Sequence, residues 1–70
     1  MSLEELLHNL KALLKEIEEF QSADEQEGLE IMPLRQAVGN LRAAITNLTK
    51  YRATRRQQLE TLGEQLDRLL

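Results

Sequence analysis

An apolar stripe with helical spacing runs through the second half of the chain, and it constrains the fold more than any other feature. Its members recur at intervals of three and four residues over residues 31–69, and only Arg52 and Arg55 among them are not apolar. This spacing places them on one side of an α-helix. The single proline, Pro33, is tolerated only in a first helical turn. We therefore predict one continuous helix over residues 32–69, about 57 Å long.

A shorter helix is predicted at the start of the chain. Ser2 is a favourable N-cap, and Glu5 follows it at the spacing of a capping box. Large apolar residues then recur at helical spacing, which predicts a helix over residues 3–21. Their stripe is wider than a two-stranded seam requires, which favours a helix with two or more neighbours. The stripe consists of Leu3, Leu6, Leu7, Leu10, Leu13, Leu14, Ile17 and Phe20.

The segment between the two predicted helices, residues 22–31, is polar, acidic and contains Gly28. We interpret it as a connection, because the apolar spacing stops there and glycine disfavours helix. Two helices joined in this way predict an all-α fold, an antiparallel helical hairpin with a long second helix.

The two predicted helices differ in length, and the difference bears on association. In an antiparallel hairpin Phe20 is expected near Ile31, and Leu3 near Leu48. The first helix then covers only the first half of the second. The leucines left without an intramolecular partner are Leu59, Leu62, Leu66 and Leu69.

Self-association is the expected way to bury these leucines, since burial of one leucine contributes roughly 1.5–3 kcal/mol. The chain has no cysteine, so no disulfide compensates for its small size. A parallel homodimer, a four-helix bundle continued by a short coiled coil, is the favoured arrangement, with Leu48 and Tyr51 joining the leucines at the interface. An antiparallel dimer is the second arrangement. A monomeric three-helix bundle, which requires a helix break within residues 49–54, is the third.

Charge is divided unequally along the chain. Residues 1–30 hold nine acidic side chains and two lysines, a net charge of −7. Residues 31–70 hold seven basic and three acidic side chains, a net charge of +4. We expect the acidic first helix to lie along the basic part of the second, with Arg35 and Arg42 flanking the seam.

Four basic residues cluster in the middle of the second helix: Lys50, Arg52, Arg55 and Arg56. Arg52 and Arg55 fall within the seam, where charges are costly unless paired or solvated. We expect them beside Glu4 and Glu5, as an ion-pair cluster that sets the register. Alternatively, the four residues form a patch for an anionic partner such as nucleic acid. The net charge of −3 and the single stacking candidate, Tyr51, make nucleic acid the less favoured partner.

The sequence contains no pattern that indicates catalysis, a cofactor or a metal ion. It has no nucleophile–base pair and no phosphate-binding loop, and its one histidine, His8, falls on the predicted solvated face. No segment resembles a signal peptide or a membrane span, so a cytoplasmic location is expected. We therefore predict a single domain, residues 1–70, that acts as a non-enzymatic interaction module: an adaptor, assembly factor, chaperone or regulator. Its expected partners are a second copy and other helical proteins.

Overall fold

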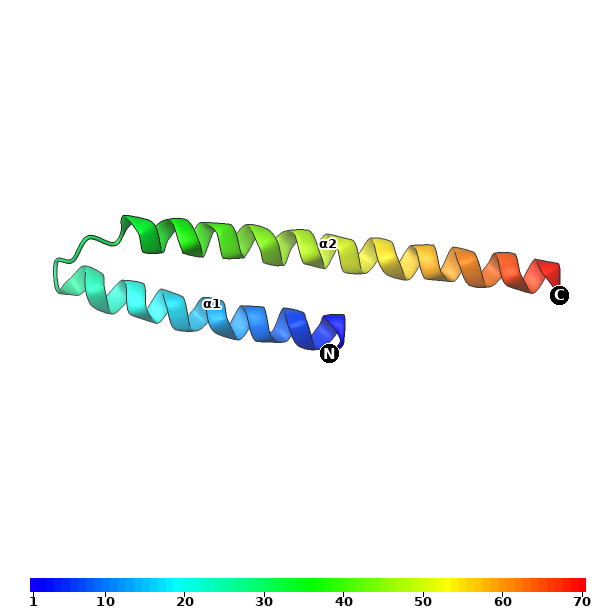
Figure 1. Ribbon diagram of the computed structural model, residues 1–70, viewed down its shortest axis with the longest axis horizontal. Helices are drawn as coiled ribbons and strands as arrows, with labels where there is room; N and C mark the ends of the chain where they lie inside the picture. The colour runs from blue at the N-terminus through cyan, green and yellow to red at the C-terminus, as the bar shows by residue number, and fades with distance from the viewer.

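The structure is a computed structural model that describes residues 1–70, the whole chain. It contains two helices, α1 (Leu3–Gln26) and α2 (Met32–Leu69), and no strand. The helices lie side by side in an antiparallel hairpin, and α2 continues far beyond the N-terminal end of α1 (Figure 1). The predicted all-α helical hairpin is confirmed. The three-helix alternative is wrong, because α2 passes through residues 49–54 without a break.

Helix α1 begins at the predicted cap but ends later than predicted. The Ser2 hydroxyl accepts a hydrogen bond from the backbone N–H of Glu5 at 3.1 Å, which satisfies one of the free donors of the first turn. The helix ends at Gln26, whereas the sequence pattern predicted an end at residue 21. The extra turn contains alanine, glutamate and glutamine, which are good helix formers, and no residue that interrupts a helix. The end of the apolar pattern was therefore mistaken for the end of the helix.

Gly28 ends α1. Its φ of 78° lies in the left-handed region, which glycine adopts without the steric cost of a Cβ atom. The N–H of Gly28 donates to the carbonyl of Glu25 at 3.1 Å, and the N–H of Leu29 donates to that of Asp24 at 3.0 Å. This pair of hydrogen bonds is a Schellman motif, which satisfies carbonyls left free at a helix end.

Helix α2 begins where the proline requires. Pro33 lies in the first turn. Backbone N–H groups in a first turn have no acceptor within the helix, so a proline there removes no hydrogen bond. The N–H of Met32 donates to the Glu30 carboxylate at 2.7 Å, so a side chain from the connection satisfies the first free donor. The predicted bounds of the second helix, residues 32–69, are confirmed.

The hairpin core is a single layer of side chains between the helices. Only Leu7, Ile31 and Val38 are buried, with exposed fractions of 2%, 8% and 6%. Around them the half-buried apolar residues are Leu3, Leu6, Leu10, Leu14 and Ile17 of α1 and Leu34, Leu41, Ile45 and Leu48 of α2. The stripe predicted for α2 therefore faces α1 up to Leu48.

Candidate interaction surface

One edge of the hairpin carries three ion pairs between the helices. They are Arg35–Glu25 at 2.9 Å, Arg42–Glu18 at 3.0 Å and Arg52–Glu4 at 2.9 Å. We call these six residues the polar edge. The glutamates share one side of α1 because multiples of seven residues separate them. Each solvated pair contributes roughly 0.2–1 kcal/mol, so the pairs define the alignment of the helices more than their stability.

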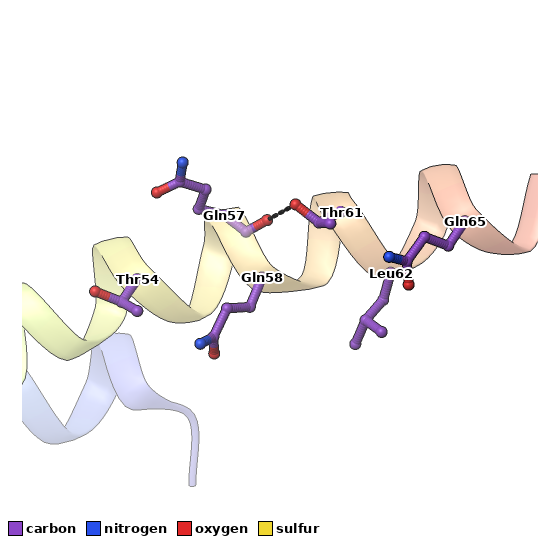
Figure 2. Close-up of a pocket in the computed structure, with 6 residues that line it drawn as sticks. All are labelled: Thr54, Gln57, Gln58, Thr61, Leu62 and Gln65. Carbon is purple, nitrogen blue, oxygen red and sulfur yellow. Dashed lines mark hydrogen bonds between the residues drawn. The ribbon is translucent and has the colours of Figure 1, made fainter.

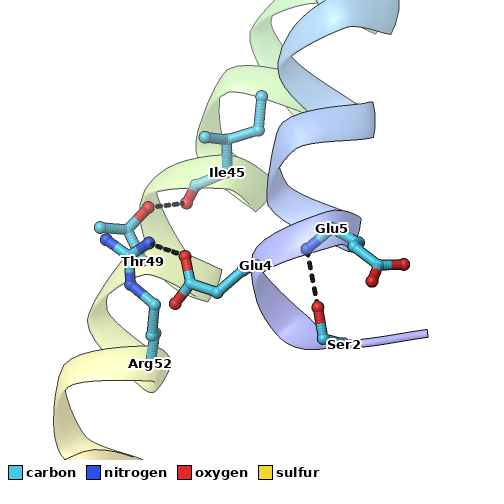
Figure 3. A network of polar contacts seen from close by, with 6 residues as sticks. All are labelled: Ser2, Glu4, Glu5, Ile45, Thr49 and Arg52. Atoms are coloured by element: carbon cyan, nitrogen blue, oxygen red, sulfur yellow. Dashed lines mark hydrogen bonds and ion pairs between the residues drawn. The ribbon is translucent and has the colours of Figure 1, made fainter.

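The pair at the open end of the hairpin was expected from the sequence. The Arg52 guanidinium donates to the Glu4 carboxylate beside the first turn of α1, as Figure 3 shows. One turn earlier in α2, the Thr49 hydroxyl donates to the carbonyl of Ile45 at 2.8 Å, which satisfies the hydroxyl within the helix. The predicted pairing of the acidic first helix with basic residues of the second is confirmed for Arg52.

The predicted register of the hairpin is wrong by about one heptad. Leu3 was expected near Leu48, but it lies with Tyr51 and Arg55 around a common depression. Likewise, Arg35 is opposite Glu25. The cause is the longer α1, which moves the turn along the chain and brings each α1 residue opposite a later residue of α2. The sequence signal that could have given this register is the helix-ending glycine of the connection.

The opposite edge of the hairpin is apolar and uncovered. On α1 it is formed by Leu6, Leu13 and Phe20, which are seven residues apart and share one side of the helix. Leu13 and Phe20 have exposed fractions of 46% and 69%. On α2 the corresponding row is Ala37, Ala44 and Tyr51. We call these two rows the apolar edge.

The α1 row and the α2 row lie on the same edge of the hairpin, as their contact at its open end shows. There Leu6 of α1 and Tyr51 of α2 line one shallow depression together with Met1, Ser2, Leu3 and Arg55. The sequence predicts the wide stripe of α1 but not its division into a part that faces α2 and a part that is exposed. That division depends on how the helices are rotated against each other, which the spacing alone does not determine.

The last part of α2, residues 56–69, extends beyond α1 and is called the tail. All of its residues are exposed. Its four stripe leucines have exposed fractions from 52% for Leu59 to 82% for Leu69. Figure 2 shows Gln58 and Leu62 pointing to the same side of the tail, while Gln57 and Thr61 lie on another side. The tail thus presents the predicted leucine stripe without a partner.

The whole chain exposes more surface than a monomer of its size. A folded monomer of 8.1 kDa is expected to expose roughly 4,500 Å², whereas this chain exposes 5888 Å². Its radius of gyration is 18.5 Å, against about 11 Å for a compact domain of 70 residues. The excess surface is roughly 1,400 Å².

The predicted anionic-partner patch is divided by the ion pairs. Arg52 is engaged with Glu4, whereas Lys50, Arg55 and Arg56 form no ion pair within the chain. We call these three residues the basic junction, because they lie where the hairpin passes into the tail. Arg55 also borders the depression beside Tyr51, so the basic junction and the apolar edge are contiguous.

The chain was compared with known proteins, and no family model, no curated protein and no solved structure matches it. Neither helix includes a stretch both long enough and apolar enough to cross a membrane. No group of three or more histidine, aspartate or glutamate side chains is arranged to hold a metal ion. What the chain offers a partner is the apolar edge, the leucine stripe of the tail and the basic junction.

Proposed function

We propose that this chain is a non-enzymatic interaction module that packs its helices against other helices, and that its first partner is a second copy of itself. The observation that carries the proposal is the excess exposed surface of roughly 1,400 Å². A protein–protein interface of standard size buries about 800 Å² of each partner, and obligate dimers bury more. The excess therefore matches what a stable dimer needs.

The small core favours a second copy over a transient partner. With only three residues buried, the hairpin gains little to offset the conformational entropy of ordering its chain. Small domains without disulfides or metals commonly obtain the missing burial by oligomerising. Another copy of the chain is a partner that is present wherever the chain itself is present. No observation favours nucleic-acid binding over this proposal, since Arg52 of the basic cluster is engaged with Glu4.

Sedimentation equilibrium over a range of concentrations tests the proposal. We expect the intact chain to be a dimer. The dissociation constant of the Leu62→Gln/Leu66→Gln variant should be at least about 100-fold higher than that of the intact chain. Glutamine is a good helix former, so the substitution removes apolar contact but preserves the helix. The matched control is Glu60→Gln/Arg68→Gln, which changes two tail residues outside the leucine stripe and leaves the net charge unchanged.

The outcomes separate cleanly. A dimer that weakens in the leucine variant but not in the control supports the proposal. An intact chain that stays monomeric at every concentration contradicts self-association. A leucine variant with the affinity of the intact chain would mean that the tail is not part of the interface.

A further inference from the structure

We propose that the two copies pack antiparallel along α2, so that the tail of each copy lies on the apolar edge of the other at its basic junction. This inference rests on the dimer proposed above and assigns its orientation and register. It goes against the parallel arrangement that the leucine pattern alone favours. Three features carry it: a second stripe on α2, the position of Arg55 within that stripe, and the depression at the open end of the hairpin.

The second stripe of α2 connects the apolar edge to the tail. It begins at Ala44, includes Tyr51, and continues to Leu69 at intervals of three and four residues, so it forms one side of the helix. In the hairpin it borders the depression beside α1, and in the tail it includes Gln58 and Leu62, which point to one side (Figure 2). The complete stripe is Ala44, Leu48, Tyr51, Arg55, Gln58, Leu62, Gln65 and Leu69.

This stripe is complementary to itself when reversed. An antiparallel copy related by a two-fold axis between Arg56 and Gln57 places every member of the stripe opposite another member. The pairs are Ala44 with the partner's Leu69, Leu48 with the partner's Gln65, Tyr51 with the partner's Leu62, and Arg55 with the partner's Gln58. A symmetric dimer requires a surface of this kind, in which each contact occurs twice.

The pairs are also matched in size and chemistry. The small side chain of Ala44 lies opposite a leucine, which allows close approach of the helices. The partner's Leu62 enters the depression that Leu6 and Tyr51 line. At the centre, the guanidinium of Arg55 is able to donate to the amide oxygen of the partner's Gln58. Arg55, which has no ion pair within one chain, thus gains an acceptor in the dimer.

Charge distinguishes the antiparallel from the parallel arrangement. Arg55 is the one charged member of the second stripe, whereas Glu60, Glu64 and Asp67 lie on the other side of the tail. In an antiparallel dimer Arg55 lies opposite the partner's Gln58, so no like charges meet between the copies. In a parallel dimer each residue lies opposite the same residue of the partner, so Arg55 faces the partner's Arg55, which costs free energy.

The first experiment measures distance between copies. The chain has no cysteine, so the exposed Gln36→Cys variant carries a single spin label, whose separation is read by pulsed electron paramagnetic resonance. The proposed register predicts roughly 60 Å between labels along the axis. A distance below about 30 Å would show a parallel dimer, and one near 45 Å would show an antiparallel dimer overlapped along its full length; either overturns the inference while leaving the dimer intact. Absence of dipolar coupling, with a monomer by sedimentation, would overturn the dimer itself.

The second experiment exchanges the residues of the central pair. We expect Gln58→Arg to weaken the dimer about fivefold or more, because it places arginine beside the partner's Arg55 twice in each dimer. Adding Arg55→Gln to the same chain should restore the affinity, since the pair is then reversed rather than broken. Dissociation constants from sedimentation that show no rescue overturn the proposed register.

Discussion

Helix α2 contains two regions with the same apolar spacing and different surroundings. Up to Leu48 its stripe faces α1, and Val38 is buried. Over residues 56–69 the stripe continues in phase, yet every residue is exposed. The difference between the regions is therefore not in their stripes but in the length of α1, which ends its coverage near Arg52 (Figure 1).

The residues beside the stripes show that the regions are suited to different neighbours. In the hairpin the adjoining row holds Ala37 and Ala44, which leave room for a further helix, whereas in the tail it holds Gln58 and Gln65. A narrow stripe flanked by polar residues is typical of a helix with one neighbour. The hairpin half is thus suited to two neighbours, α1 and a second helix, and the tail to one.

The largest effect on stability is expected from truncating a side chain in the core of the hairpin, the region of α2 that α1 covers. We expect Leu7→Ala to lower the free energy of unfolding by about 2–4 kcal/mol, because Leu7 is 2% exposed and its removal leaves a cavity. Urea denaturation followed by circular dichroism measures this loss.

The loss in Leu7→Ala is to be compared with that in Leu69→Ala, which truncates the most exposed leucine of the tail stripe. Its loss should be smaller than about 1.5 kcal/mol, and it should shrink on dilution because it arises from association. The loss for Leu7→Ala should persist at every protein concentration. Equal losses in the two variants would contradict the distinction between a covered and an uncovered region.

The next effect concerns two glycines, one that ends α1 and one inside the tail. Gly28→Ala should cost about 1–2 kcal/mol, because alanine is strained at a φ of 78°. Gly63→Ala should instead stabilise the chain by about 0.5–1 kcal/mol, since it replaces glycine within a helix and the added Cβ meets no atom within 4 Å. The midpoint of thermal unfolding should fall for the first variant and rise for the second. The same sign for both would mean that the turn at Gly28 is not as described.

The sequence predicted the features that depend on local spacing. The cap at Ser2, the start of α2 beside Pro33, the continuity of α2 and the stripe from Leu34 to Leu48 all follow from propensity and periodicity. Pairing of α1 glutamates with α2 arginines also followed, because the charge asymmetry is visible along the chain.

The features that the sequence analysis missed depend on where the turn lies. The apolar spacing of α1 stops at Phe20, but the helix continues in polar residues until Gly28 interrupts it, and the register moves by about one heptad. A shift of this size preserves which faces meet, so the apolar pattern does not detect it. The exposed row of Leu13 and Phe20 was missed for a related reason: a wide stripe does not reveal which part of it the first neighbour covers.

The smallest effect lies at the boundary between the two regions, where Glu4 binds Arg52. We expect Glu4→Gln to lower the free energy of unfolding by about 0.3–1 kcal/mol more than Glu5→Gln does, because the pair is solvated. Both glutamates lie in the first turn of α1, so both substitutions remove the same favourable interaction with the helix dipole. Glu5 forms no ion pair in the chain, and the difference between the variants therefore isolates the contact with Arg52. In about 1 M salt the difference should vanish, since screening acts over about 3 Å at that concentration. A difference that survives high salt would mean that Glu4 contributes by packing at the end of the hairpin, and the covered region would then extend further toward the tail than the ion pair alone indicates.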